Sequence, residues 1–142
     1  MNQKIRIISK YILLFLIGGL LYGCVEVLFR GRTHISMLIV GGIDFIFIGL
    51  LNETLSWDVA MTSQMILSSL IIDLSELISG IYLNIYLGLN VWDYSDLPYN
   101  FLGQVSLEFS VIWFFFSLIP ITLDDYLRYK YLGEEKPHYK IL

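Results

Sequence analysis

Charged residues are scarce in this chain of 142 residues: they make up 15% of it, against about 25% in an average soluble domain. Hydrophobic residues account for 56%, and the mean hydropathy is +0.68. This balance excludes an ordinary soluble domain and is typical of an integral membrane protein. The length favours a single domain over residues 1–142.

Cysteine and histidine are also nearly missing. Cys24 is the one cysteine, which excludes an intrachain disulfide and a Cys-based zinc site, and we expect it to be a small buried apolar residue. His34 and His138 have no neighbour at metal-ligand spacing. The sequence therefore predicts no cofactor and no metal, and it favours a protein that is not an enzyme. A lipid-active enzyme remains an alternative, because carboxylates alone can hold Mg²⁺ on a lipid phosphate.

Basic residues form no patch with interleaved aromatic residues, and the formal net charge is −4. Proteins that bind nucleic acid need such a positive surface to neutralise phosphates. Nucleic acid is therefore not an expected partner.

Four apolar runs are each long enough to cross a bilayer, which takes about 20 helical residues. They lie near 11–29, 35–51, 60–87 and 105–123, and a polar tail follows over 124–142. The first run also resembles a secretory signal or a lipoprotein start ending in "LLYGC", but its length and Tyr22 favour a retained helix. The expected fold is all-α, with about four transmembrane helices.

Lysine and arginine predict the orientation of this fold. Seven of them flank the first and last runs, whereas only Arg30 and Arg32 lie in the first connection. Because basic residues stay in the cytoplasm, we expect a protein of the cytoplasmic membrane with both termini inside.

The connection "GLNVWDYSDLPYNFLG", residues 88–103, is rich in aromatic residues that suit a membrane interface. Ser95 or Asp96 before Pro98 resembles a helix N-cap, which predicts a short interfacial or re-entrant helix. The residues expected to contact lipid or a partner protein are Trp92, Asp93, Tyr94, Pro98, Asn100 and Gln104.

Polar residues follow one face of the third run, at helical spacing: Ser69, Asp73, Glu76, Gly80 and Asn84. This stripe should face protein or water, because an ionised acid at mid-bilayer costs at least ~2.5–3.5 kcal/mol. The fourth run carries a matching seam of small or polar residues, which we interpret as a packing surface: Ser106, Ser110, Trp113, Ser117, Pro120 and Asp124.

Two shorter patterns accompany these faces. Gly19 and Gly23 form a small-residue packing motif in the first run, where Glu26 and Arg30 are spaced for an ion pair. Gln104 and Glu108 form a further i, i+4 pair near the start of the fourth run.

Acids in or near the apolar runs outnumber their basic partners. Asp73 and Glu76 are the main candidates for binding a cation or a proton, Glu26 and Asp44 are secondary candidates, and Arg30, Asn84 and Glu108 are supporting residues. Such an interior either accepts a cation or keeps its carboxyls protonated. The alternative is that protonated carboxyls simply bond helices together, for about 0.6 kcal/mol each.

A family resemblance rests mainly on the stretch from residue 88 to 129. It is carried by Asn90, Trp92, Asp93, Tyr94, Pro98, Asn100, Gly103, Gln104, Phe109 and Trp113, together with Gly23 and Glu26 upstream. These residues resemble the CmpB-like family of small bacterial membrane proteins, which are labelled ABC-transporter permeases. The region "THISMLIVGGIDFIFIGLL" departs from the longer relatives, since only its glycines correspond.

Two functions remain open from the sequence. The first is a small homo-oligomeric transporter or channel for a cation or a cationic or proton-coupled solute, surrounded by membrane lipids. The second is a membrane subunit that binds a partner protein or lipid. The connection "NETLSWDVA" is very short for coupling to an ATPase, which favours the first.

Overall fold

The structure is a computed structural model and describes residues 2–142. Its elements are α1 (Gln3–Arg30), α2 (Ile35–Thr54), α3 (Met61–Gly80), the π-helical turn η1 (Ile81–Tyr86), β1 (Asn100–Phe101), β2 (Val105–Ser106), α4 (Leu107–Phe116) and α5 (Leu118–Leu132). Four helical stretches are long and apolar enough to cross a membrane: Gln3–Arg30, Ile35–Thr54, Met61–Tyr86 and Leu107–Leu132. The predicted all-α membrane fold is confirmed.

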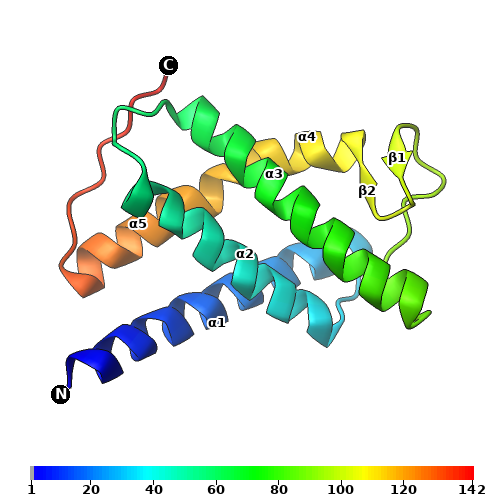
Figure 1. Cartoon of the computed structure of the whole chain (residues 1–142), viewed down its shortest axis with the longest axis horizontal. Helices are drawn as coiled ribbons and strands as arrows, with labels where there is room; N and C mark the ends of the chain where they lie inside the picture. The colour runs from blue at the N-terminus through cyan, green and yellow to red at the C-terminus, as the bar shows by residue number, and fades with distance from the viewer. Residues whose placement is uncertain (1) are drawn as a thin grey trace.

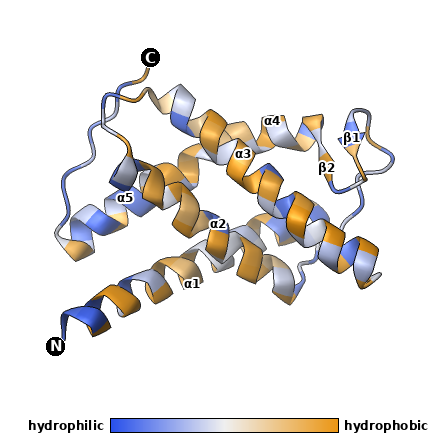
Figure 2. Ribbon diagram, in the orientation of Figure 1, coloured by the Kyte–Doolittle hydropathy of each residue, from blue (hydrophilic) through white to orange (hydrophobic). Residues whose placement is uncertain are grey.

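The helices run alternately up and down, so that both ends of the chain lie at one end of the molecule (Figure 1). The connection between α2 and α3 lies at this same end, and the loop before α4 lies at the other. Polar residues gather at the two ends, and the apolar ones lie between them (Figure 2). This arrangement fits the predicted topology, in which both termini lie on one side of the membrane. That this side is the cytoplasm stays a prediction.

Helices α1 and α2 make the closest contact in the bundle, through glycines. A Cβ on Gly19 would lie 2.4 Å from the carbonyl oxygen of Leu38, and a Cβ on Gly23 would lie 2.3 Å from a methyl group of the same residue. Any larger side chain would push the helices apart. The predicted packing role of Gly19 and Gly23 is therefore confirmed.

The last membrane-spanning stretch is longer than expected and is broken at Ser117, between α4 and α5. Pro120 has no N–H to donate to the carbonyl of Phe116, which interrupts the helical hydrogen bonds near this point. Helix α5 then continues to Leu132. The last helical stretch therefore extends beyond the expected bound at residue 123, and the non-helical part of the tail begins at Gly133.

The loop before α4 contains no short helix, contrary to expectation. Residues 88–103 form turns that lead into a two-stranded antiparallel hairpin, in which Asn100 pairs with Ser106. Asn90, Tyr99 and Leu102 have positive φ angles of 48°, 53° and 54°. These positive φ angles are left-handed backbone conformations, which a right-handed helix does not allow. The three residues bend the chain back on itself instead.

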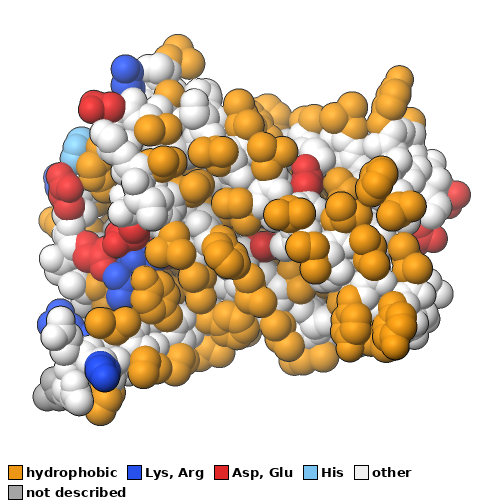
Figure 3. All heavy atoms as spheres, in the orientation of Figure 1, with side chains coloured by type: hydrophobic (Ala, Val, Ile, Leu, Met, Phe, Trp, Pro, Cys, Tyr) orange, Lys and Arg blue, Asp and Glu red, His pale blue; other side chains and the backbone are white. Residues whose placement is uncertain are grey.

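The surface is largely apolar, as a lipid-facing surface should be (Figure 3). Cys24 is on this surface, so the expectation that it is buried is wrong. Its side chain points outward because α1 turns Gly23 and Glu26 toward the interior instead.

Candidate functional site

The polar stripe on α3 faces the protein interior, as predicted. Glu76 is 1% exposed and Asn84 is 8% exposed, while Asp73 is partly buried. Neighbouring apolar residues on the same helix, such as Leu74 and Ile78, point outward. The sequence periodicity therefore identified the correct face.

The seam on α4 packs against this stripe through serine hydroxyls. Ser69 donates to the carbonyl of Ser110 at 2.8 Å, and Ser110 donates to Asp73 Oδ2 at the same distance. Ser117 is fully buried at the break between α4 and α5. The interpretation of the seam as a packing surface is confirmed, and one of the two acids bonds to it.

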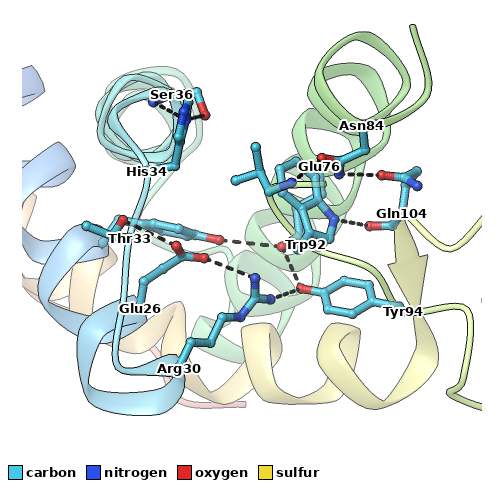
Figure 4. Close-up of polar contacts among 12 residues, drawn as sticks. Glu26, Arg30, Thr33, His34, Ser36, Glu76, Asn84, Trp92, Tyr94 and Gln104 are labelled. Carbon is cyan, nitrogen blue, oxygen red and sulfur yellow. Dashed lines mark hydrogen bonds and ion pairs between the residues drawn. The ribbon is translucent and has the colours of Figure 1, made fainter. Parts of the chain in front are cut away.

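Glu76 is the centre of a different set of contacts, drawn in Figure 4. The Tyr94 hydroxyl donates to Glu76 Oε1 at 3.3 Å, and Tyr22 from α1 approaches the same oxygen at 3.5 Å. Burial, and next the carboxyl of Glu76, raise the pKa of Tyr94 above its ordinary value. The Tyr94 hydroxyl therefore stays protonated and remains a hydrogen-bond donor.

Arg30 connects this carboxyl to a second one. Its guanidinium donates to the Tyr94 oxygen at 2.8 Å and forms the predicted ion pair with Glu26, at 3.5 Å. Thr33 also donates to Glu26, at 3.2 Å. The groups form a continuous polar chain from Glu26 through Arg30 and Tyr94 to Glu76 (Figure 4), which we call the Glu76 network.

A cavity of about 260 Å³ opens beside this network, between α1 and α4. Glu26, Arg30 and Glu108 line it, together with aromatic side chains. Glu108 is exposed and cannot pair with Gln104, because Gln104 lies in the hairpin rather than in α4. The suggested pairing of these two residues is wrong, but Glu108 does line a mainly apolar cavity together with Glu26 and Arg30.

Gln104 instead fastens the hairpin to the end of the third span. Its side-chain oxygen accepts from Asn84 at 2.8 Å, and its backbone carbonyl accepts from the Trp92 indole at 3.0 Å. Gly80 leaves the space that Gln104 fills, since a Cβ there would lie 2.4 Å from the Gln104 oxygen. Asn84 therefore supports the site by holding the loop that supplies Tyr94.

The loop residues expected to contact lipid or a partner divide into two groups. Trp92 and Tyr94 are each 4% exposed and pack against Met37, so the expectation of outward contact is wrong for them, as it is for the buried Gln104. Asp93, Pro98 and Asn100 are exposed. Hydrogen bonds from Ser95 lower the pKa of Asp93, and Asn100 accepts from the N–H of Gly103 at 3.0 Å, so both stabilise turns.

Asp44 lies on α2, outside the Glu76 network. It is 4% exposed, and Ser75 from α3 donates to its Oδ2 at 2.8 Å. Within residues 2–142, no hydrogen-bond partner reaches Asp44 Oδ1, Asp73 Oδ1 or Glu76 Oε2. The buried Asp44 and Glu76 and the partly buried Asp73 therefore each have one oxygen with free acceptor capacity.

A second buried charge cluster, at the other end of the bundle, was missed from the sequence. Arg128 donates to Asp124 at 2.5 Å, and its guanidinium lies 3.6 Å from Glu53 and 3.7 Å from Glu134. Glu134 also pairs with Lys10; burial opposes ionisation of Glu134, but this ammonium helps to lower its pKa. The i, i+4 spacing of Asp124 and Arg128 was the available signal.

In the part of the chain that the structure describes, no group of three or more His, Cys, Asp or Glu residues is arranged to hold a metal ion. The carboxyls of the α3 stripe instead point to neighbours on other helices.

Four long apolar helices that enclose buried acids define a multi-pass membrane protein. The comparisons with known proteins narrow this class to a family. The model of the CmpB family, described as "Putative ABC-transporter type IV", matches residues 1–139, so the chain belongs to this family and the resemblance noted in the sequence is confirmed. Neither the curated proteins nor the solved structures contain a match. The family description and the four helices are those of a transport-related membrane protein.

Proposed function

We propose that the protein is a small membrane transporter or channel for a proton or another cation, with Glu76 as the main binding group. The observation that carries this proposal is a carboxyl 1% exposed inside a membrane-spanning helix, with one oxygen unpartnered among the described residues. An ionised acid in such surroundings is unstable alone. A bound proton or cation would stabilise it.

The Glu76 network supports this role. Tyr94 accepts from Arg30 and donates to Glu76 Oε1, so the guanidinium, which keeps its protons, fixes a hydroxyl donor against the carboxyl. Glu26 and Arg30 line the cavity of about 260 Å³ beside the network. Glu26 balances the charge of Arg30, which leaves Glu76 without a basic partner of its own among the described residues.

Asp73 and Asp44 have secondary roles in this proposal. Asp73 lies one helical turn before Glu76 and bonds to Ser110. A second acid so close makes it harder for both to be ionised without a cation. We further propose that several copies associate, since four helices enclose little space, and that both termini are cytoplasmic.

The test is ion flux in liposomes. Wild type and Glu76→Gln are reconstituted, and proton, Na⁺ and K⁺ fluxes are recorded under imposed gradients. Asp96→Asn is the matched control, because it makes the same change of acid to amide on an exposed loop residue. We expect flux in the wild type and the control and none in folded Glu76→Gln.

Two results would contradict the proposal. Flux through Glu76→Gln at the wild-type rate would remove Glu76 from the pathway. The absence of proton, Na⁺ and K⁺ flux in folded wild type would exclude transport of these ions.

A partner-binding membrane subunit is the second candidate, because the family is described as "Putative ABC-transporter type IV" and one surface of the chain suits a contact with another protein. The exposed hairpin offers a contact surface, with Tyr99 83% exposed and Phe101 59% exposed. Co-purification of one partner protein in constant ratio would favour this function. Isolation of a homo-oligomer that conducts ions by itself would argue against it.

A further inference from the structure

A groove of about 550 Å³ runs between α2 and α3, on the side away from the Glu76 network. Its walls are apolar: Val40, Ile43 and Phe47 come from α2, and Leu74, Ile78 and Tyr82 come from the third span. Figure 3 shows this apolar face, with acidic atoms sunk among hydrophobic side chains near its middle. The volume is within the range of ~300–1,000 Å³ that drug-sized ligands occupy.

Asp44 is the one carboxyl among the described residues that line the groove. It is 4% exposed, and only its Oδ2 is bonded, to the Ser75 hydroxyl at 2.8 Å. Its Oδ1 has no partner anywhere in residues 2–142. A buried acceptor in apolar surroundings costs free energy until a donor reaches it, and a positively charged donor satisfies it best.

We propose that this groove binds a lipophilic organic cation, an amine or ammonium compound whose apolar body lies against the groove walls and whose charged nitrogen contacts Asp44. Charge complementarity argues for this ligand class. Phe47 and Tyr82 add aromatic rings to the walls, and such rings attract cations. A lipid acyl chain would fill the apolar walls equally well but would leave Asp44 Oδ1 without a donor.

The inference extends the proposed function to a class of solute. It rests on the proposed function only for movement of the solute across the membrane, because binding in the groove requires neither a gradient nor Glu76. Binding in the groove and the proposed transport function can therefore fail separately.

Binding is measured with ethidium, a permanent aromatic cation, on purified protein in detergent by fluorescence anisotropy. N-phenylnaphthylamine, which is apolar and neutral, serves as the second probe. We expect Asp44→Asn to weaken ethidium binding about tenfold or more, corresponding to about 1.4 kcal/mol, and to leave the neutral probe within about twofold. Asp44→Glu should retain ethidium binding.

A pair of tryptophan variants tests the location. Ile78→Trp puts a large ring into the groove from an exposed position, whereas Leu70→Trp is the matched change on the same helix outside the groove. We expect Ile78→Trp to abolish binding of both probes and Leu70→Trp to change neither. Glu76→Gln should bind ethidium normally even where it abolishes ion flux.

Three results would overturn the inference. They are ethidium binding that Asp44→Asn leaves unchanged, ethidium binding that Ile78→Trp leaves unchanged, and a wild type that binds only the neutral probe. The last result would identify the groove as a site for lipid chains. If Asp44→Asn does not fold, the two tryptophan variants still decide the question, because both substitutions lie on the surface.

Discussion

Tyr94 joins two charged side chains that come from different helices. Its oxygen accepts from Arg30 and its hydroxyl donates to Glu76, and the ring lies under the guanidinium at 5.6 Å. The residue is buried but belongs to a loop, so it contributes to the site without belonging to any of the four spans. One hydroxyl therefore satisfies two partners that would otherwise face each other across an apolar interior.

Replacing this hydroxyl tests its role. We expect Tyr94→Phe to lower the free energy of unfolding by about 1–3 kcal/mol, because it leaves buried polar groups unsatisfied, and to slow proton flux. Unfolding is measured by titration with dodecyl sulfate and followed by circular dichroism. Tyr99→Phe is the matched control, since its side chain is 83% exposed and should show no change in either measurement. Equal behaviour of the two variants would contradict a bridging role for Tyr94.

The sequence predicted part of this site. Asp73 and Glu76 could be assigned to one inward face because helical periodicity is local. The Glu26–Arg30 pair followed from spacing within one helix in the same way. Tyr94 could not be connected to Glu76, because that contact depends on how the loop turns back, and three of its left-handed residues, Asn90, Tyr99 and Leu102, are not glycine.

At the scale of elements, the amide side chain of Gln104 fastens the loop before α4 to the third span. Gln104→Ala removes the acceptor for Asn84 and the contact with Gly80. We expect residues 93–101 to exchange amide hydrogens faster and to be cleaved sooner by protease, while the helices stay intact. Hydrogen exchange with mass spectrometry measures this. Asp96→Ala, on the same exposed loop, should leave both rates unchanged.

Helix α5 is anchored by a buried ion pair. Because removing one partner leaves an uncompensated buried charge, we expect Arg128→Met to cost about 3–5 kcal/mol of unfolding free energy. The double variant Asp124→Leu with Arg128→Met should recover much of this loss, since the closest buried charge, at 2.5 Å, is removed with it. The comparison is made by dodecyl sulfate titration. A double variant less stable than the single one would contradict this account.

The four spans were predictable because bilayer thickness sets a minimum apolar length that can be counted along the chain. The hairpin was not, because Ser95, Asp96 and Pro98 suit a helix start and a turn equally well. In the structure, Asp93 accepts from the N–H of Ser95 at 2.8 Å, which closes a turn. The extension of α5 was also missed, because a count of hydropathy scores its charged residues as polar although several of them are buried.

At the scale of the whole molecule, the described ends of the chain lie at the end of the bundle opposite the hairpin (Figure 1). In a Cys24→Ala background, we expect Tyr99→Cys to react with a membrane-impermeant maleimide on intact cells. Glu135→Cys should react only after the cells are opened. Both side chains are exposed, at 83% and 67%, so accessibility within the fold is matched. The reverse pattern would place the termini outside.

The four-span, up-and-down path has a consequence for covalent assembly. Because the last described residue lies at the same end of the bundle as the first, two copies can be joined in tandem by a linker that never crosses the bilayer. Each copy would keep its own orientation, since an even number of spans returns the chain to the side on which it started. Concatemers of this kind would allow one altered Glu76 to be placed in a chosen copy of an assembly.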